Sequence, residues 1–179
     1  MLSAPLYHSK DIRPVMIRFK FLIFAALGLQ IMAVLSQDEI LTRAVILSTY
    51  PLLIIVAIIN RRLWGMRLIL AGALLNFIVM AANGGLMPIS STAVVKVGGQ
   101  EMIDAIPIGE PLPGSKSVLV QEHQMVLGAF ADRFVVDFPI IGLKVLSVGD
   151  LLIGAGMILA TAQILNGAAT SVLGENRHG

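Results

Sequence analysis

Four apolar runs dominate the chain and are separated by polar segments. They cover residues 16–35, 40–59, 63–82 and 146–165. Each run has close to the roughly 20 residues that an α-helix needs to cross about 30 Å of hydrocarbon at about 1.5 Å per residue. The pattern predicts an all-α membrane protein with four transmembrane helices and a long, partly ordered outer segment, residues 83–145, between the third and fourth helices.

Composition and charge agree with a lipid bilayer as the solvent of these runs. Hydrophobic residues make up 56% of the chain and the mean hydropathy is +0.86, against roughly 45–50% apolar residues in an average soluble domain. The net charge is only +2, so we assign the basic residues to topology and anionic lipid headgroups rather than to nucleic acid.

The basic residues predict the orientation. Asp38 and Glu39 occupy the first link, whereas Lys and Arg flank the opposite ends of the runs. Because cytoplasmic loops are enriched in Lys and Arg, residues 1–15 and 166–179 are predicted to be cytoplasmic tails. The flanking basic residues are Lys10, Arg13, Arg18, Lys20, Arg61, Arg62 and Arg67.

The first link and the first run allow two further interpretations. Ser36 and Glu39 have the Ser-x-x-Glu spacing of a capping box, which predicts a tight turn into the second helix. The first run also fits a signal peptide cleaved before Gln37, although a second apolar run begins only four residues after it ends.

The outer segment has several local signals. Residues 91–97 fit a short helix or a strand, and residues 107–114 form a turn-rich stretch. Residues 118–133 have room for a short helix, and the apolar residues 134–146 are expected to lie along the membrane surface. A segment this apolar is expected to fold as a lid onto the helices or against another subunit.

Several polar and glycine-containing motifs occur from the first predicted helix to the fourth. They are Gln30, Arg61-Arg62-Leu63-Trp64, Asn76, Asn83-Gly84-Gly85-Leu86-Met87-Pro88, Asp132-Arg133 and Ser147-Val148-Gly149-Asp150. Together these motifs resemble an uncharacterised family of small bacterial integral membrane proteins, DUF5317, a domain of unknown function. The resemblance implies a shared topology, but the family has no established activity.

The same motifs supply the candidate site at the outer interface. Asn83, Gly84 and Gly85 fit either a helix C-cap or a nest of backbone amides that binds an anion. Asp150 fits a capping box with Ser147, an ion pair with Arg133, or a general acid.

Two more polar residues have expected structural roles. The adjacent Asp132 and Arg133 are expected to fix the lid by hydrogen bonds. Asn76, near the middle of the third run, is expected to form an interhelical hydrogen bond, because a lipid-facing amide is unfavourable.

The sequence predicts no cofactor, no metal site and no catalytic residue. There is no Cys, and His8, His123 and His178 all lie outside the apolar runs. A loop histidine beside Glu122 is more often solvated than a ligand, and nothing identifies a small-molecule substrate. The central parts of the runs lack Asp, Glu, Lys and Arg, which argues against an ion-coupled transporter.

These observations favour a non-catalytic accessory or assembly subunit that packs against other membrane protein subunits. The alternative is a small membrane enzyme or lipid-binding protein with a site formed by Asn83, Arg133 and Asp150 at the outer interface. The two hypotheses differ in whether these side chains converge on an open pocket or are used in caps and lid contacts.

Overall fold

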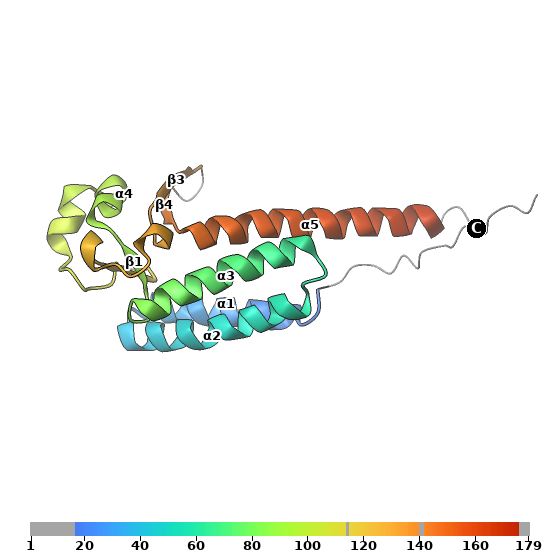
Figure 1. The fold of residues 1–179 in the computed structure, drawn as a ribbon, viewed down its shortest axis with the longest axis horizontal. Coiled ribbons are helices and arrows are strands. Elements are labelled where there is room, and N and C mark those ends of the chain that lie inside the picture. The colour runs from blue at the N-terminus through green and yellow to red at the C-terminus, as the bar shows by residue number, and fades with distance from the viewer. Residues whose placement is uncertain (1–16, 114, 140–141, 176–179) are drawn as a thin grey trace, which may run out of the picture.

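The protein is mostly helical, with five α-helices in the part of the chain that the structure describes (Figure 1). The computed structural model describes residues 17–113, 115–139 and 142–175, with side chains up to residue 166. The predicted tail at residues 1–15 lies outside the described residues. The helices are α1 (Lys20–Leu35), α2 (Glu39–Ile59), α3 (Trp64–Ala82), α4 (Ser91–Ala105) and α5 (Val148–Glu175).

Three of these helices, α2, α3 and α5, are long and apolar enough to cross a membrane. The first predicted span is shorter than expected, because α1 has 16 residues and is about 24 Å long at the usual rise. The last helix is longer than expected, since α5 continues ten residues past Leu165 to Glu175. Part of the predicted tail at 166–179 is therefore helical.

The late start of α1 is caused by a contact with Asn60, which is distant in sequence. The Asn60 amide accepts a 2.8 Å hydrogen bond from the Arg18 backbone N–H and donates a 3.0 Å bond to the Arg18 carbonyl. Phe19 then takes a left-handed conformation, φ 60°, as the N-cap. The chain is thus held in a turn against the C-terminus of α2, where the sequence pattern predicted continuous helix.

The turn from α1 to α2 differs from the predicted capping box. Ser36 closes α1 as its C-cap, and its hydroxyl donates to the Ala33 carbonyl. Asp38 is the N-cap of α2 and accepts a 3.0 Å hydrogen bond from the Leu41 N–H. Gln30 crosses between the two helices and donates to Thr49 Oγ1 at 2.7 Å. The antiparallel hairpin expected here is present, with a different residue as its cap.

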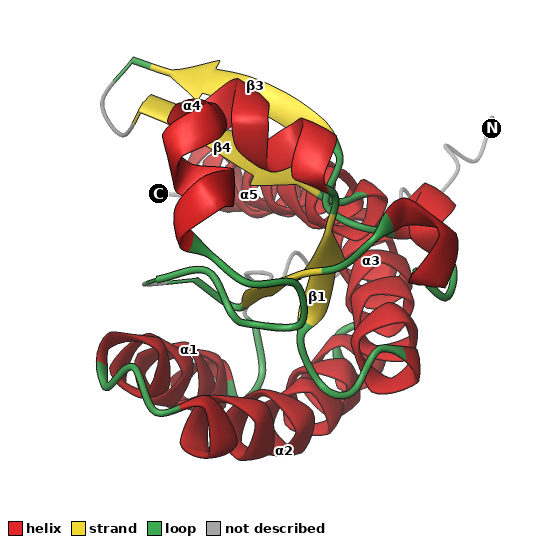
Figure 2. Ribbon diagram, turned by 90° about the vertical axis from the view of Figure 1, so that its left-hand side faces the viewer, coloured by secondary structure: helices red, strands yellow, loops and turns green. Residues whose placement is uncertain are grey.

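The long helices form an open arc rather than a closed bundle (Figure 2). α1 packs on α2, α2 on α3, and α3 on α5, and the α3–α5 contact is the most extensive. At the end of the helices where α3 begins, opposite the cap, Gln163 of α5 accepts a 3.0 Å hydrogen bond from the Gly65 N–H.

Residues 83–147, which we call the cap, join α3 to α5 and contain two small sheets. β1 (Met87–Ile89) pairs in parallel with β2 (Ser117–Leu119). β3 (Phe134–Phe138) pairs antiparallel with β4 (Gly142–Leu146). Two 3₁₀ turns, η1 (Glu122–Gln124) and η2 (Gly128–Phe130), lie between β2 and β3.

The cap corrects several expectations for the outer segment. The stretch left open at 91–97 is part of the helix α4, and residues 118–133 hold the two 3₁₀ turns. Within residues 134–146 the strands β3 and β4 pair antiparallel, so the protein is not purely α-helical. The base of the cap shares a hydrophobic core with α2 and α3, formed by Ile46, Tyr50, Val79, Met80, Leu86, Met87 and Val118.

Candidate functional site

A group of polar side chains meets where the cap joins α3 and α5. We call it the junction cluster. Asn76 comes from α3, Lys116 and Ser117 from the cap at β2, Asp132 from the loop before β3, and Ser147 and Asp150 from the start of α5. Asn76, Ser117, Asp132 and Ser147 are buried, and Lys116 and Asp150 are partly buried.

Asp150 connects three segments of the chain. Its Oδ1 accepts hydrogen bonds from the Asn76 amide at 2.8 Å and from Lys116 Nζ at 3.3 Å. Its Oδ2 accepts from the Ser147 backbone N–H at 3.1 Å. Both carboxylate oxygens are therefore used inside the protein, by α3, by the cap and by the first turn of α5.

Ser147 and Asp150 form the reciprocal capping box predicted from their spacing. The Asp150 N–H donates to Ser147 Oγ at 3.0 Å, and Ser147 N–H donates back to the carboxylate. The Ser147 hydroxyl in turn donates to Asn76 Oδ1 at 2.8 Å. Asn76 therefore makes the interhelical hydrogen bonds expected of a buried amide.

Glycines bring the backbones of α3 and α5 close enough for these bonds. A Cβ on Gly72 would lie 2.4 Å from the Gly149 carbonyl oxygen, and one on Gly149 would lie 2.1 Å from Asn76 Oδ1. Gly65 and Gly156 make the matching contact two turns away. Such distances admit no side chain, so the glycine contacts set the helix separation that places Asn76 against Asp150.

Lys116 is positioned by the parallel sheet. Met87 N–H donates to the Lys116 carbonyl at 3.0 Å, which fixes the residue at the edge of β2. Burial opposes the charge of Lys116, but Tyr50, Asp150 and Asp132 together raise the pKa of the ammonium above its ordinary value. Lys116 is therefore a stable cation between two carboxylates.

Asp132 is the least satisfied member of the cluster. Its Oδ2 accepts from Ser117 Oγ at 2.7 Å, but Oδ1 is buried without a hydrogen-bond partner among the described residues. Burial raises the pKa of the Asp132 carboxyl to about 6, although Lys116 and Ser117 favour the ionised form. Its backbone N–H donates to the Pro88 carbonyl at 3.2 Å, which attaches the loop to β1.

The raised pKa of Asp132 predicts a pH-dependent stability. The folded protein holds a proton on Asp132 that the unfolded chain loses at lower pH, so this group's contribution to the free energy of unfolding falls as pH rises from about 4 to about 6. Asp132→Asn should remove that fall and raise the free energy of unfolding by about 1–2 kcal/mol at neutral pH.

Thermal unfolding in detergent across this pH range tests the prediction. Asp137→Asn, at an exposed residue of β3, is the matched control and should follow the parent profile. A pH profile of Asp132→Asn that runs parallel to the parent's would show that Asp132 does not titrate in this window.

The other candidate residues lie outside the cluster. The Asn83 amide donates to the Val79 and Val126 carbonyls at 2.7 and 2.8 Å and accepts from the Val126 N–H at 3.0 Å. Gly84 and Gly85 both have positive φ, 78° and 98°, and the Gly84 carbonyl accepts from Arg43. Of the two alternatives for this motif, the structure supports a helix C-cap.

The ion pair considered between Asp150 and Arg133 is not formed. Arg133 is exposed, and its guanidinium donates to the Ala129 carbonyl at 3.4 Å. The physical reason is the sheet register, because Arg133 precedes β3 and its backbone N–H donates to the Leu146 carbonyl. Lys116 takes the position next to Asp150 that sequence reasoning considered for Arg133.

The junction cluster lines neither of two surface cavities in the described part of the chain. One cavity of about 170 Å³ lies between the α1–α2 turn and the loop at 111–115, lined in part by Glu39, Thr42 and Ser115. The other lies against α4. No group of three or more metal-binding side chains occurs within the described residues.

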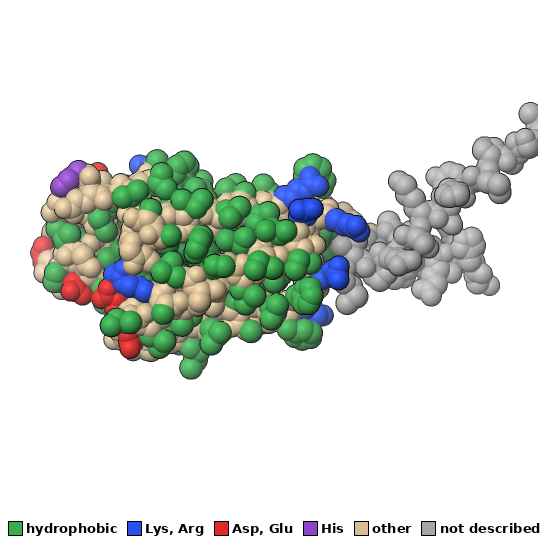
Figure 3. Space-filling model, turned by 60° about the horizontal axis from the view of Figure 1, so that its bottom comes forward, with side chains coloured by type: hydrophobic (Ala, Val, Ile, Leu, Met, Phe, Trp, Pro, Cys, Tyr) green, Lys and Arg blue, Asp and Glu red, His purple; other side chains and the backbone are tan. Residues whose placement is uncertain are grey.

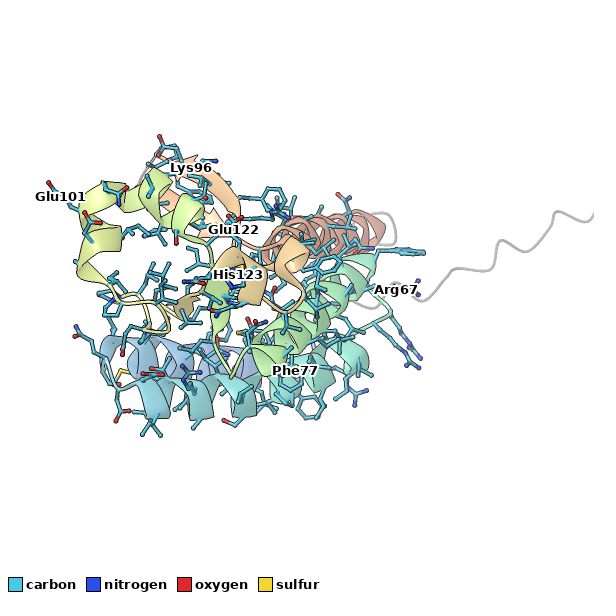
Figure 4. The ribbon with its side chains drawn as sticks, turned by 60° about the vertical axis from the view of Figure 1, so that its left-hand side comes forward. Arg67, Phe77, Lys96, Glu101, Glu122 and His123 are labelled. Carbon is cyan, nitrogen blue, oxygen red and sulfur yellow. The ribbon has the colours of Figure 1, made fainter. Side chains whose placement is uncertain are left out.

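The one described histidine also lies apart from the cluster. Figure 4 shows His123 beside Glu122 on η1, on the outer part of the cap. The Glu122 carboxylate accepts a 3.3 Å hydrogen bond from Thr92 Oγ1 of α4. This hydrogen bond holds η1 against α4. No second histidine lies beside His123 in the described part of the chain.

The motifs of this site extend over most of the chain, and a family model matches them as a unit. The model of DUF5317, a family of unknown function, matches residues 14–162. The chain belongs to DUF5317. No curated protein and no solved structure matches the chain. The resemblance noted in the sequence is thereby confirmed, and the site in this DUF5317 protein has to be interpreted from its own geometry.

Sequence reasoning missed two members of the site in this DUF5317 protein. Lys116 and Ser117 stand in a Ser- and Pro-rich stretch that predicts turns and gives no sign of a buried ion pair. The only signal was the isolated SVLV run at 117–120, which has the β-branched and apolar character of a short strand. Placing it beside β1 requires a contact across 30 residues that no local pattern contains.

Proposed function

We propose that this DUF5317 protein is a non-catalytic accessory or assembly subunit of a larger membrane complex. The observation that carries the proposal is the use of the candidate polar groups inside the protein. The Asp150 carboxylate is hydrogen-bonded to Asn76, Lys116 and Ser147. The Asn83 amide is hydrogen-bonded to backbone groups. Asn83, Arg133 and Asp150 do not converge on an open pocket, as a site for chemistry would require.

The exposed surface of α1 supports the same proposal. Among the four helices of the arc, α1 has its main packing contact with α2 alone. Phe21, Phe24 and Met32 are each about 70% exposed along its length. A helix this short and this incompletely packed suits a contact with the helices of another subunit as well as with lipid.

The proposed location is the bacterial cytoplasmic membrane, with both chain termini on the cytoplasmic side. Support comes from the charge distribution in Figure 3, where the charged groups at the end of the helices opposite the cap are Arg and Lys, whereas the acidic groups lie at the cap end together with further basic groups. The described basic residues at that end are Arg18, Lys20, Arg61, Arg62 and Arg67.

Single cysteines test this orientation directly, since the parent chain has none. In intact cells a membrane-impermeant thiol reagent should label Gln124→Cys, in the exposed part of the cap, and should leave Ser9→Cys unlabelled until the membrane is opened. The reverse labelling pattern would invert the proposed orientation.

Site-specific photocrosslinking tests the subunit proposal. A photoreactive amino acid at Phe24 of α1, and separately at Ile158 of α5, places a probe on two exposed apolar faces. In native membranes at least one position should form a covalent adduct with one other polypeptide, and the same variants in vesicles of purified protein should not form it.

The opposite outcome favours the alternative function. Absence of protein adducts at both positions, together with a membrane-associated activity that Asp150→Ala abolishes in a folded protein, would replace the subunit proposal. It would indicate a small enzyme or lipid-binding protein instead.

A further inference from the structure

An exposed apolar loop lies beside the C-terminus of α3. We propose that this loop, residues 126–130, is a membrane-interface anchor whose side chains enter the lipid headgroup and upper acyl region next to α3. The inference rests on the proposed membrane location of the helices. Its apolar residues are Val126, Leu127 and Phe130, which are 50%, 42% and 38% exposed.

The side chain of Asn83 fixes the loop at the level of the helix end. Asn83 caps α3 through the Val79 carbonyl and simultaneously pairs with both backbone groups of Val126. The turn η2 contacts α3, and in Figure 1 the orange turn that precedes β3 lies closer to the long helices than α4 does. The loop therefore lies where the apolar part of α3 ends.

The loop lies beside a helix that has an exposed apolar face. Ala71, Leu74, Ile78 and Ala81 are exposed at helical spacing along one side of this helix. η2 packs against α3, and Figure 2 shows the 3₁₀ turns at the outer flank of the arc. Because lipid is the proposed environment of the exposed helix face, lipid is also the occupant expected at the loop beside it.

The backbone of Leu127 supports an apolar environment. Leu127 adopts φ 58°, a left-handed conformation that Gly or Asn takes with less strain. A solvated turn would gain nothing from leucine at this position. The polar residues Glu122, His123 and Gln124 precede the loop on η1 and are exposed, as expected for groups that face the headgroups and water.

Tryptophan fluorescence in brominated lipids tests the anchor. Trp64 is the only Trp of the chain and lies 62% exposed at the start of α3, so the parent reports on the opposite helix end. In a Trp64→Phe background, Leu127→Trp carries the probe into the loop. Val95→Trp on α4, at a residue 38% exposed, is the matched control in the outer cap.

The full chain is reconstituted in phosphatidylcholine vesicles with bromine near either the headgroup end or the methyl end of the acyl chain. The anchor predicts that the emission of the Leu127→Trp variant is shifted to the blue and is quenched more by the shallow bromines than by the deep ones. The emission of the Val95→Trp variant should be unquenched. Phe130→Trp repeats the measurement if Leu127→Trp does not fold.

The controls separate the two proposals. Quenching of Trp64 in the parent, with unquenched emission from both loop variants, would overturn the anchor and leave the membrane proposal standing. Absence of quenching in the parent and in both loop variants would contradict insertion of the helices themselves. Equal quenching of the Val95→Trp and Leu127→Trp variants would contradict a specific loop anchor.

Discussion

Gly149→Ala should separate α3 from α5 and lower the free energy of unfolding by about 3 kcal/mol. The added Cβ would lie 2.1 Å from Asn76 Oδ1 and 2.6 Å from the Gly72 carbonyl oxygen. Asn76 Oδ1 cannot move away without breaking its hydrogen bond from Ser147, and the Gly72 carbonyl oxygen belongs to the backbone of α3. One methyl group therefore disturbs the helix contact and the junction cluster together.

Gly154→Ala is the matched control for this substitution. Gly154 lies on the same helix, and a Cβ there meets no atom within 4 Å. Since alanine is about 1 kcal/mol better than glycine in a helix interior, this variant should be neutral or slightly more stable. Thermal unfolding followed by helical circular dichroism in detergent measures both. Equal stability of the two variants would show that the close α3–α5 contact is absent.

Lys116→Met should have the second largest effect, a loss of about 2–3 kcal/mol in the free energy of unfolding. Removal of the ammonium leaves Asp150 and Asp132 without their shared cation. We expect a smaller loss than the roughly 3–5 kcal/mol that follows when one partner of a fully buried ion pair is removed, because Lys116 and Asp150 keep some solvent contact. Lys144→Met, at an exposed lysine of β4, is the matched control and should change stability by less than about 0.5 kcal/mol.

A double-mutant cycle distinguishes a specific pair from a general loss of charge. Asp150→Asn keeps an acceptor for Asn76 and removes the charge that Lys116 faces. The double variant Lys116→Met with Asp150→Asn should lose at least about 1 kcal/mol less than the sum of the single variants. Strict additivity would mean that the two groups do not interact.

The sequence predicted those parts of the fold that depend on local periodicity. Three of the predicted helices have the length and composition of membrane spans, and the Ser147–Asp150 box and the interhelical bonding of Asn76 follow from spacing and position. The start of α1 could not be predicted in this way. It is set by Asn60, 42 residues away from Arg18, through a contact that apolar length does not encode.

In the cap, even more of the structure depends on contacts between residues that are distant in sequence. Its parallel strands have three residues each, too few for a period to be recognised, and they pair across 30 residues. That pairing brings Lys116 to Asp150, so the cation of the junction cluster was missed. Arg133 was considered as the partner of Asp150 in its place, although the Arg133 side chain points to another part of the cap.

We infer that the junction cluster is a structural lock that holds the cap against α3 and α5. Hydrogen–deuterium exchange of the β1 and β2 amides in reconstituted vesicles measures this directly. Faster exchange of these amides is expected in Lys116→Met than in the parent, with Lys144→Met unchanged. Unchanged exchange in Lys116→Met, together with loss of a membrane-associated activity, would contradict a structural lock and mark the cluster as a site of chemistry.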